Sequence, residues 1–327
     1  MSSNDFSIPG TFQPHLQRQT VGSTWGTAQP ATRLSLRAAR RQARRRRWGN
    51  FWIAMCIGLL IYQGTCHIYN WTTPPRTLFM LTDPSDEEII FEEVKLEHIS
   101  RIYLAAVLLH EDDQLGTRQG PFDVSKFIER AKVHLNGGDD EPSSSIPQQL
   151  VKNIYLVRGE QDIVRVVRKG VEAFMSYPFN ITVSDTRQLE LYMNYAQFGP
   201  GIYGICAATW YYYNRPPWDG DFEIATLLAG VLPAGEDARR AEGGGLDVSA
   251  NVDLPLREAI WNALKVVPDA YANYGGWENV MATMGIYDTA EDHAAERDDP
   301  LSCSVMPESV AYRLKSEGAW WSEEYGG

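Results

Sequence analysis

Apolar residues recur at steps of three and four along much of the chain after residue 95. The spacing is clear in five stretches, which cover residues 96–109, 127–135, 163–174, 189–196 and 222–231. Such steps place side chains on one face of an α-helix, because a helical turn takes 3.6 residues. Long runs of alternating apolar and polar residues, which would indicate strands, are missing from the sequence. The pattern therefore predicts a mostly α-helical domain.

A different apolar stretch lies nearer the start of the chain. Between Trp48 and Pro75 the sequence contains no Asp, Glu, Lys or Arg. About 20 helical residues are enough to cross the ~30 Å hydrocarbon core of a membrane. We therefore expect a transmembrane helix at residues 48–70. A cleaved signal peptide is the alternative, but the basic region lies far from the start and no small-residue cleavage pattern follows.

The net charge of −12 combines two opposite parts. The first 50 residues contain nine Arg and a single acid, so this segment carries +8 and the remainder carries −20. The basic run Arg40–Arg47 directly precedes the apolar stretch, and Arg-rich flanks stay on the cytoplasmic side. We expect residues 1–47 to form a disordered cytoplasmic tail of a single-pass protein, with everything after about residue 72 outside. An acidic outer domain disfavours nucleic acid as a partner.

The chain after the apolar stretch divides into three segments of different composition. Residues 71–86 contain three prolines and are predicted to be a linker, residues 87–290 a helical domain, and residues 291–327 an acidic extension without an assigned role. The four cysteines form no C-x-x-C pair, so a zinc or thioredoxin-like site has no support. Cys206 and Cys303 either pair in an oxidising compartment or remain two buried thiols, and the sequence leaves both open.

Four short segments carry polar residues that helix formation alone does not require. The first contains Glu111 and Asp112, at the end of an apolar helix, where solvated helix-end charges are the plain alternative. The second contains Ser144, which a helix start before Pro147 explains, followed by four residues that a helix start does not explain. Those four place several hydrogen-bond donors on one or two turns, as an anionic ligand would need, and they are Gln148, Gln149, Lys152 and Asn153.

The other two segments place polar side chains on a shared helix face. Arg168 and Glu172 are four residues apart, with Lys169 between them, and a surface ion pair is the plain alternative. Glu190 and Asn194 are also four residues apart. Each segment is weak evidence when taken singly.

In their order and spacing the four segments resemble the motifs of the family-51 peptidoglycan glycosyltransferases, of the monofunctional biosynthetic transglycosylase type. The resemblance covers roughly residues 85–240. The chain departs from the family pattern at Leu115, where Phe is usual, and at Arg118, where His is usual, so it resembles a divergent member. No lysine has a Ser three residues before it, so the Ser-x-x-Lys motif of a penicillin-binding transpeptidase domain is absent from the sequence.

The resemblance implies a lysozyme-like helical glycosyltransferase domain with a smaller, apolar, membrane-facing lobe at roughly residues 115–160. It implies an enzyme that polymerises lipid II into glycan strands, by inverting β-1,4 transfer with undecaprenyl diphosphate as leaving group. Glu111 matches the general base and Glu172 the second essential acid. Lys152, Arg168 and Lys169 match the cations at the diphosphate. Further substrate-binding positions are Asp112, Ser144, Gln148, Gln149, Asn153, Glu190 and Asn194.

The same resemblance implies lipid II, the growing glycan strand and membrane lipid as partners, at a bacterial cytoplasmic membrane. Proteins of cell wall elongation or division are a further expectation that no motif identifies. No cofactor is required, although Glu172 could hold Mg²⁺ or Mn²⁺ at the diphosphate or order the cationic side chains instead. The alternatives are an inactive scaffold that kept the fold, a lysozyme-like hydrolase, and a nucleotide-sugar transferase suggested only by Asp219 and Asp221.

Overall fold

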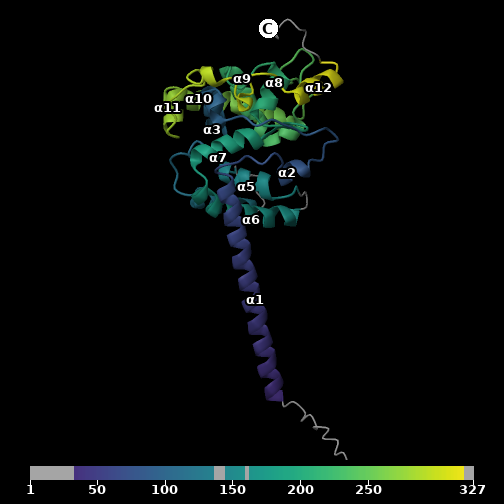
Figure 1. Ribbon diagram of the computed structural model, residues 1–327, viewed down its shortest axis with the longest axis vertical. Coiled ribbons are helices and arrows are strands. Elements are labelled where there is room, and N and C mark those ends of the chain that lie inside the picture. The colour runs from purple at the N-terminus through teal and green to yellow at the C-terminus, as the bar shows by residue number, and fades with distance from the viewer. Residues whose placement is uncertain (1–32, 136–143, 159–161, 320–327) are drawn as a thin grey trace, which may run out of the picture. The chain divides into compact units, whose positions relative to one another are not determined.

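The computed structural model describes residues 33–135, 144–158 and 162–319, and most of the described elements are helices (Figure 1). The main helices are α1 (Arg33–Ile68), α2 (Leu78–Leu81), α3 (Arg101–Glu111), α4 (Val124–Leu135), α5 (Ile146–Tyr155), α6 (Asp162–Thr182), α7 (Asp185–Tyr195), α8 (Ile205–Tyr213), α9 (Phe222–Val231), α10 (Leu254–Tyr274), α11 (Trp277–Ala282) and α12 (Glu308–Ser316). The chain forms two compact units, residues 1–57 and 58–327. The prediction of a mostly helical protein is confirmed.

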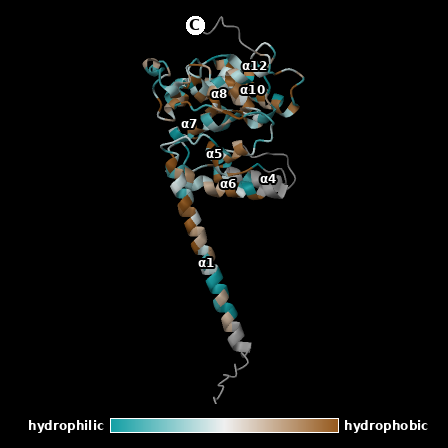
Figure 2. Ribbon diagram, turned by 45° about the vertical axis from the view of Figure 1, so that its right-hand side comes forward, coloured by the Kyte–Doolittle hydropathy of each residue, from teal (hydrophilic) through white to brown (hydrophobic). Residues whose placement is uncertain are grey.

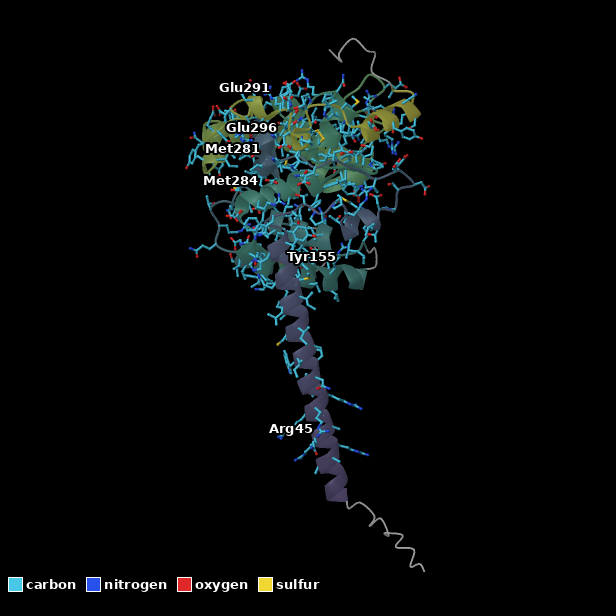
Figure 3. All side chains as sticks on the ribbon, in the orientation of Figure 1. Arg45, Tyr155, Met281, Met284, Glu291 and Glu296 are labelled. Atoms are coloured by element: carbon cyan, nitrogen blue, oxygen red, sulfur yellow. A yellow bond between two sulfur atoms is a disulfide. The ribbon has the colours of Figure 1, made fainter. Side chains whose placement is uncertain are left out.

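The first unit contains most of the long helix α1. Its segment Ala38–Ile68 is long and apolar enough to cross a membrane, and Trp48, Phe51 and Trp52 are exposed on it. Figure 2 shows the change from hydrophilic to hydrophobic residues along α1, and Figure 3 shows Arg45 projecting from the hydrophilic part. One such helix suggests a membrane anchor.

The predicted disordered tail is wrong for residues 33–47, because α1 already begins at Arg33. Arg, Ala and Leu are good helix formers, and here they continue the turn pattern of the apolar stretch. Residues 1–32 of the predicted tail lie outside the described residues.

In the second unit, the last turns of α1 pack against α5 and α6. The Tyr62 hydroxyl donates a hydrogen bond to the Met175 carbonyl at 2.8 Å, and the hydroxyls of Thr65 and Tyr155 lie 3.1 Å apart. α6 also carries apolar side chains that remain exposed, at the helical spacing of one face. These are Val167, Val171, Phe174 and Ile181. An exposed apolar face is what a membrane-facing lobe requires. That lobe was expected at residues 115–160, and α6 lies just beyond this range.

Helix α3 lies at the centre of the larger lobe, in contact with α9, α10 and α11. Its seven consecutive residues Tyr103–Leu109 are all buried. A helix that is apolar on every side belongs in a protein core. The core therefore fixes the position of the last residue of α3, which is Glu111.

A small sheet joins one strand that precedes α3 to two strands that follow α7. Its strands are β1 (Ile90–Phe91), β2 (Gln197–Gly199) and β3 (Ile202–Tyr203), in the order β1-β3-β2. β1 pairs parallel to β3 with Ile90 opposite Ile202, and β2 pairs antiparallel to it. Gly204 then starts α8 with a φ of 84°, and a Cβ there would lie 2.7 Å from the Asn194 carbonyl oxygen. Only glycine permits this close approach to α7.

Residues 291–319 belong to the same compact unit as the helical domain, as do the residues predicted to be a linker. Val310 and Leu314 of α12 are buried, and a disulfide joins Cys206 of α8 to Cys303. The alternative of two free thiols is therefore wrong for this pair. The predicted boundary at residue 290 does not separate two folded parts, because both sides share one core.

Candidate active site

Glu111 ends α3 with its carboxylate held by two neighbours. Oε1 lies 2.8 Å from His110 Nδ1, and Oε2 accepts a hydrogen bond from Gln149 Nε2 at 2.6 Å. The side chain is only 9% exposed. A carboxylate held in this way has a defined orientation, as a general base requires.

Gln149 connects Glu111 to the rest of the site. Its Nε2 also donates to the Ser144 carbonyl at 3.0 Å, and its Oε1 accepts from the Tyr192 hydroxyl at 3.1 Å. Burial, followed by the nearby charge of Glu111, raises the pKa of Tyr192 well above its ordinary value. Tyr192 therefore stays protonated as a donor and fixes which way the Gln149 amide points.

A second polar group surrounds Glu172 on α6. Its carboxylate is 3% exposed and lies 3.4 Å from Arg168 Nε and 3.1 Å from Lys169 Nζ. Lys169 also donates to the Ser144 hydroxyl. A buried carboxylate between two cations holds both in place, because separating them would leave a buried charge unpaired.

These contacts form one connected series from Glu111 to Glu172. It runs from Glu111 through Gln149 and Ser144 to Lys169 and Glu172. The series joins the end of α3, the start of α5 and the middle of α6. The structure thus brings together five of the predicted site residues, together with Arg168.

Lys152 adds a further positive charge on α5. Its Nζ lies 5.2 Å from the centre of the Phe79 ring. Burial lowers the pKa of Lys152, and the negative charge of Glu172 opposes this effect. A partly desolvated ammonium binds an anion more strongly than a fully hydrated one.

Asp112 supports the site from the α3 end. Its two oxygens accept hydrogen bonds from Arg118 at 2.5 and 2.9 Å, and one of them also accepts from the Ile146 backbone N–H at 3.1 Å. The bidentate pair and the backbone bond tie the end of α3 to the start of α5. Arg118, which stands where His was expected, therefore has a structural role.

Three predicted substrate-binding residues make polar contacts inside the protein, and a fourth, Asn153, is buried. Gln148 accepts from the Ser145 backbone N–H at 3.2 Å and caps α5. Glu190 pairs with Arg187, and Asn194 bonds both backbone groups of Val94. These bonds give Gln148, Glu190 and Asn194 structural roles, and they lend no support to the predicted substrate contacts.

Two residues of the site were missed in the sequence. His110 lies next to Glu111, and Tyr192 belongs to the fourth segment, yet neither was singled out as a site residue. Their role depends on contacts with the Glu111 carboxylate and with Gln149, which the sequence does not encode locally. Tyr192 follows Leu189 by three residues, and this spacing predicts a shared apolar face but no contact with Gln149.

The Glu172 group does not make a metal site by itself. Each of its carboxylate oxygens contacts a cationic side chain. Among the described residues, the group of three side chains placed to hold a metal ion lies elsewhere in the molecule. The contacts of Glu172 with Arg168 and Lys169 are the ones that the second expected role, ordering the cations, requires.

Comparison with known proteins agrees with this geometry. The transglycosylase family model matches residues 81–248, which is half of the chain. A protein of Mannheimia succiniciproducens named biosynthetic peptidoglycan transglycosylase is 33% identical over 148 residues, 45% of this chain and 59% of that protein. Proteins of the same name from Pasteurella multocida and Shewanella amazonensis are each 30% identical, over 54% and 58% of this chain and 72% and 78% of their own length.

The match includes Glu111, Lys152, Lys169 and Glu172, and it ends before α10. The resemblance inferred from the four segments is thus confirmed by whole-domain similarity. The chain belongs to the transglycosylase family.

Proposed function

We propose that the chain polymerises lipid II into glycan strands during peptidoglycan synthesis. Its family membership and the names of its relatives support synthesis over hydrolysis. The acceptor is the 4-hydroxyl of one sugar, and the donor is a strand linked to undecaprenyl diphosphate. Attack from the face opposite the diphosphate inverts the α-linked donor to a β-1,4 bond.

Glu111 acts as the general base. An alcohol is a poor nucleophile, so a carboxylate must take its proton as the new bond forms. The contacts with His110 and Gln149 hold the Glu111 carboxylate in one orientation. Each oxygen of a carboxylate has two lone pairs, so acceptor capacity remains for the incoming hydroxyl.

The cations around Glu172 stabilise the leaving diphosphate. Negative charge develops on the diphosphate as its bond to the sugar breaks, and preorganised positive groups stabilise such charge. Arg168 and Lys169 are held by Glu172, and Lys152 adds a partly desolvated ammonium. Glu172 therefore acts as a positioning residue for these cations.

The observation that carries the proposal is the chain of bonds from Glu111 to Glu172. It connects the proposed base, Glu111, to the cations proposed to bind the diphosphate, through Gln149 and Ser144. A fixed arrangement between the base and the leaving-group cations is what an in-line displacement requires.

The reaction takes place at the outer face of a bacterial cytoplasmic membrane. The Arg-rich start of α1 supports a cytoplasmic N-terminus, because such flanks stay inside. The disulfide between Cys206 and Cys303 supports an oxidising compartment for the helical domain. An anchored enzyme meets its lipid-linked substrate within the plane of the membrane, where proteins of elongation or division are natural partners.

The test is polymerisation of lipid II by the full chain in detergent, comparing the wild type with Glu111→Gln. The variant keeps the size of the side chain but replaces one acceptor oxygen with a donor NH2 and loses the base, so we expect turnover to fall by at least about 100-fold. Asp113→Asn is the matched control, because this neighbouring acid is exposed, and it should keep wild-type turnover.

Two outcomes would contradict the proposal. Equal polymerisation by Glu111→Gln and the wild type would remove Glu111 as the base. Shortening of preformed glycan strands, without growth from lipid II, would identify a hydrolase. Folding of each protein is checked by its thermal unfolding midpoint.

A further inference from the structure

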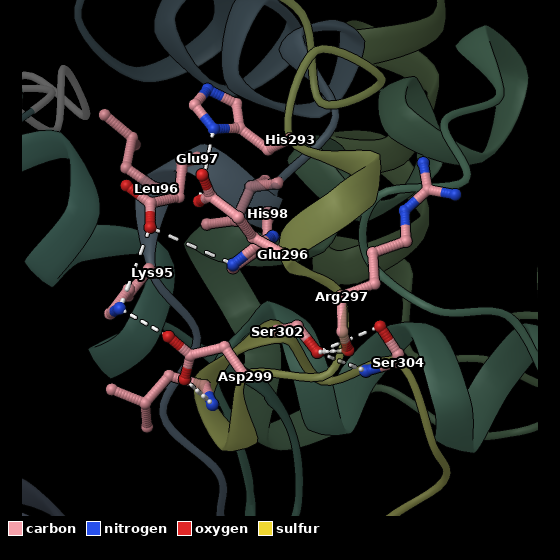
Figure 4. A network of polar contacts seen from close by, with 12 residues as sticks. Lys95, Leu96, Glu97, His98, His293, Glu296, Arg297, Asp299, Ser302 and Ser304 are labelled. Carbon is pink, nitrogen blue, oxygen red and sulfur yellow. Dashed lines mark hydrogen bonds and ion pairs between the residues drawn. The ribbon is translucent and has the colours of Figure 1, made fainter.

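A second cluster of titratable side chains lies away from the active site. It joins the turn η1 (Leu96–His98), which precedes α3, to the turn η3 (Ala294–Glu296) near the C-terminus (Figure 4). One ligand atom each from Glu97, His98 and Glu296 lies within 4.8 Å of the others. Helix α3 has 11 residues and spans roughly 16 Å, so the cluster and Glu111 lie at opposite ends of it.

His98 is the unusual member of the cluster. Its side chain is 1% exposed, and among the described residues neither of its ring nitrogens has a hydrogen-bond partner. The nearest carboxylate oxygen, on Glu97, lies 3.9 Å from Nε2, which is beyond hydrogen-bond distance. Buried polar groups are nearly always paired, so an imidazole in this position points to a ligand.

The nearby charged groups have their closest contacts with other partners. Lys95 lies 2.6 Å from Asp299 but 3.7 Å from Glu97. His293 lies 2.7 Å from Asp288 but 3.6 Å from Glu296. Among the described residues, Glu97 and Glu296 thus have their nearest cationic groups at 3.7 and 3.6 Å, beyond hydrogen-bond distance, and both lie beside the His98 ring.

We propose that Glu97, His98 and Glu296 bind a divalent transition-metal ion of the zinc type. Imidazole nitrogen with carboxylate oxygen suits such ions, whereas Mg²⁺ and Ca²⁺ prefer oxygen alone. Bonds of about 2.0–2.2 Å in tetrahedral geometry place ligand atoms roughly 3.4 Å apart. The two carboxylates are 38% and 62% exposed, so they can rotate inward to reach this spacing, with water as the fourth ligand.

The site would connect a segment inside the family match to a segment beyond it. Glu97 and His98 lie inside the segment matched by the transglycosylase family, and Glu296 lies beyond it. The ion would therefore attach the C-terminal extension to the turn that leads into α3, as the disulfide attaches it to α8. This role is structural and does not depend on the proposed catalytic function.

The test is zinc binding by the full chain in detergent, purified without a histidine tag and stripped with a chelator. Titration calorimetry and elemental analysis should give one Zn²⁺ per chain, and Ca²⁺ should bind far more weakly. Glu296→Gln should lower zinc affinity by at least about 100-fold, because even the loss of a group behind a ligand costs 10–100-fold. Glu291→Gln is the matched control, because Glu291 is an exposed acid of the same C-terminal part and pairs with Arg297. Figure 3 labels both Glu291 and Glu296.

Zinc should also raise the thermal midpoint of the wild type and of Glu291→Gln, but not that of Glu296→Gln. His98→Gln should abolish binding. Because His98 is buried and this variant could fail to fold, the exposed Glu296 provides the decisive comparison. Absence of stoichiometric zinc, equal affinity in Glu296→Gln, or equal affinity for Ca²⁺ would each overturn the proposal.

Discussion

Replacing Asn194 tests whether a predicted substrate-binding residue is structural. Its side-chain oxygen accepts from the Val94 N–H at 2.8 Å, and its amide nitrogen donates to the Val94 carbonyl at 2.8 Å and to the Glu190 carbonyl at 2.9 Å. Both Asn194 and Val94 are fully buried. Asn194→Ala removes all three bonds and leaves two backbone groups of Val94 without their partner.

The magnitude follows from those two groups. A buried polar group that loses its partner costs about 1–3 kcal/mol, so Asn194→Ala should lower the free energy of unfolding by about 2–6 kcal/mol. In a domain of this size each kcal/mol shifts the midpoint by about 2–4 °C, so we expect a fall of at least about 4 °C. Asn279→Ala is the control, because its bond to the Tyr274 carbonyl is exposed and its loss should cost less than about 0.5 kcal/mol.

The assay combines tryptophan fluorescence during heating, at one scan rate, with lipid II polymerisation at several substrate concentrations. We expect a lower midpoint for Asn194→Ala and unchanged KM and turnover per folded molecule. A wild-type midpoint together with a raised KM would refute the structural role and return Asn194 to the substrate site.

Three further predictions concern the disulfide, the pH dependence of stability and the membrane face. Changing both Cys206 and Cys303 to Ser should lower stability by about 2–4 kcal/mol, and a reductant should then lower the thermal midpoint of the wild type only. Burial alone would raise the pKa of Asp83, but hydrogen bonds from Ser85 and other neighbours lower it below 3.8. Its stabilisation is therefore present above that pH and is lost as the pH falls through the lowered folded value, so Asp83→Asn should lower the midpoint at pH 7 and match the wild type in strong acid. Phe174→Glu should raise the KM for lipid II in vesicles but not in detergent, because it places a charge on the exposed apolar face of α6; equal KM values in vesicles would contradict a membrane contact.

The helices were predictable because their signal is local. A step of three or four residues fixes which side chains share a helix face, and α3, α7 and α9 follow that pattern closely. The same spacing does not reveal whether the apolar face packs in the protein core or remains exposed. The apolar positions of α6 look like core positions in the sequence, yet Val167 and Phe174 are exposed.

The acids and cations of the site were also predictable, since Glu111, Lys169 and Glu172 stand in recognisable segments. Their connection was not, because it joins residues far apart in the chain. Gln149 is 38 residues from Glu111, and Lys169 is 25 residues from Ser144. The packing of α3, α5 and α6 brings them within hydrogen-bond distance.

The sequence by itself therefore determined the helical class, the apolar anchor segment and the chemical groups of the active site, because each depends on residue type and short spacing. Only the tertiary structure decided which polar side chains lie in the active site and which form hydrogen bonds with the backbone, as Asn194 does with Val94. It also decided the pairing of Cys206 with Cys303 and the attachment of the C-terminal extension. Those outcomes depend on neighbours that only folding brings together, and short-range patterns carry no information about such neighbours.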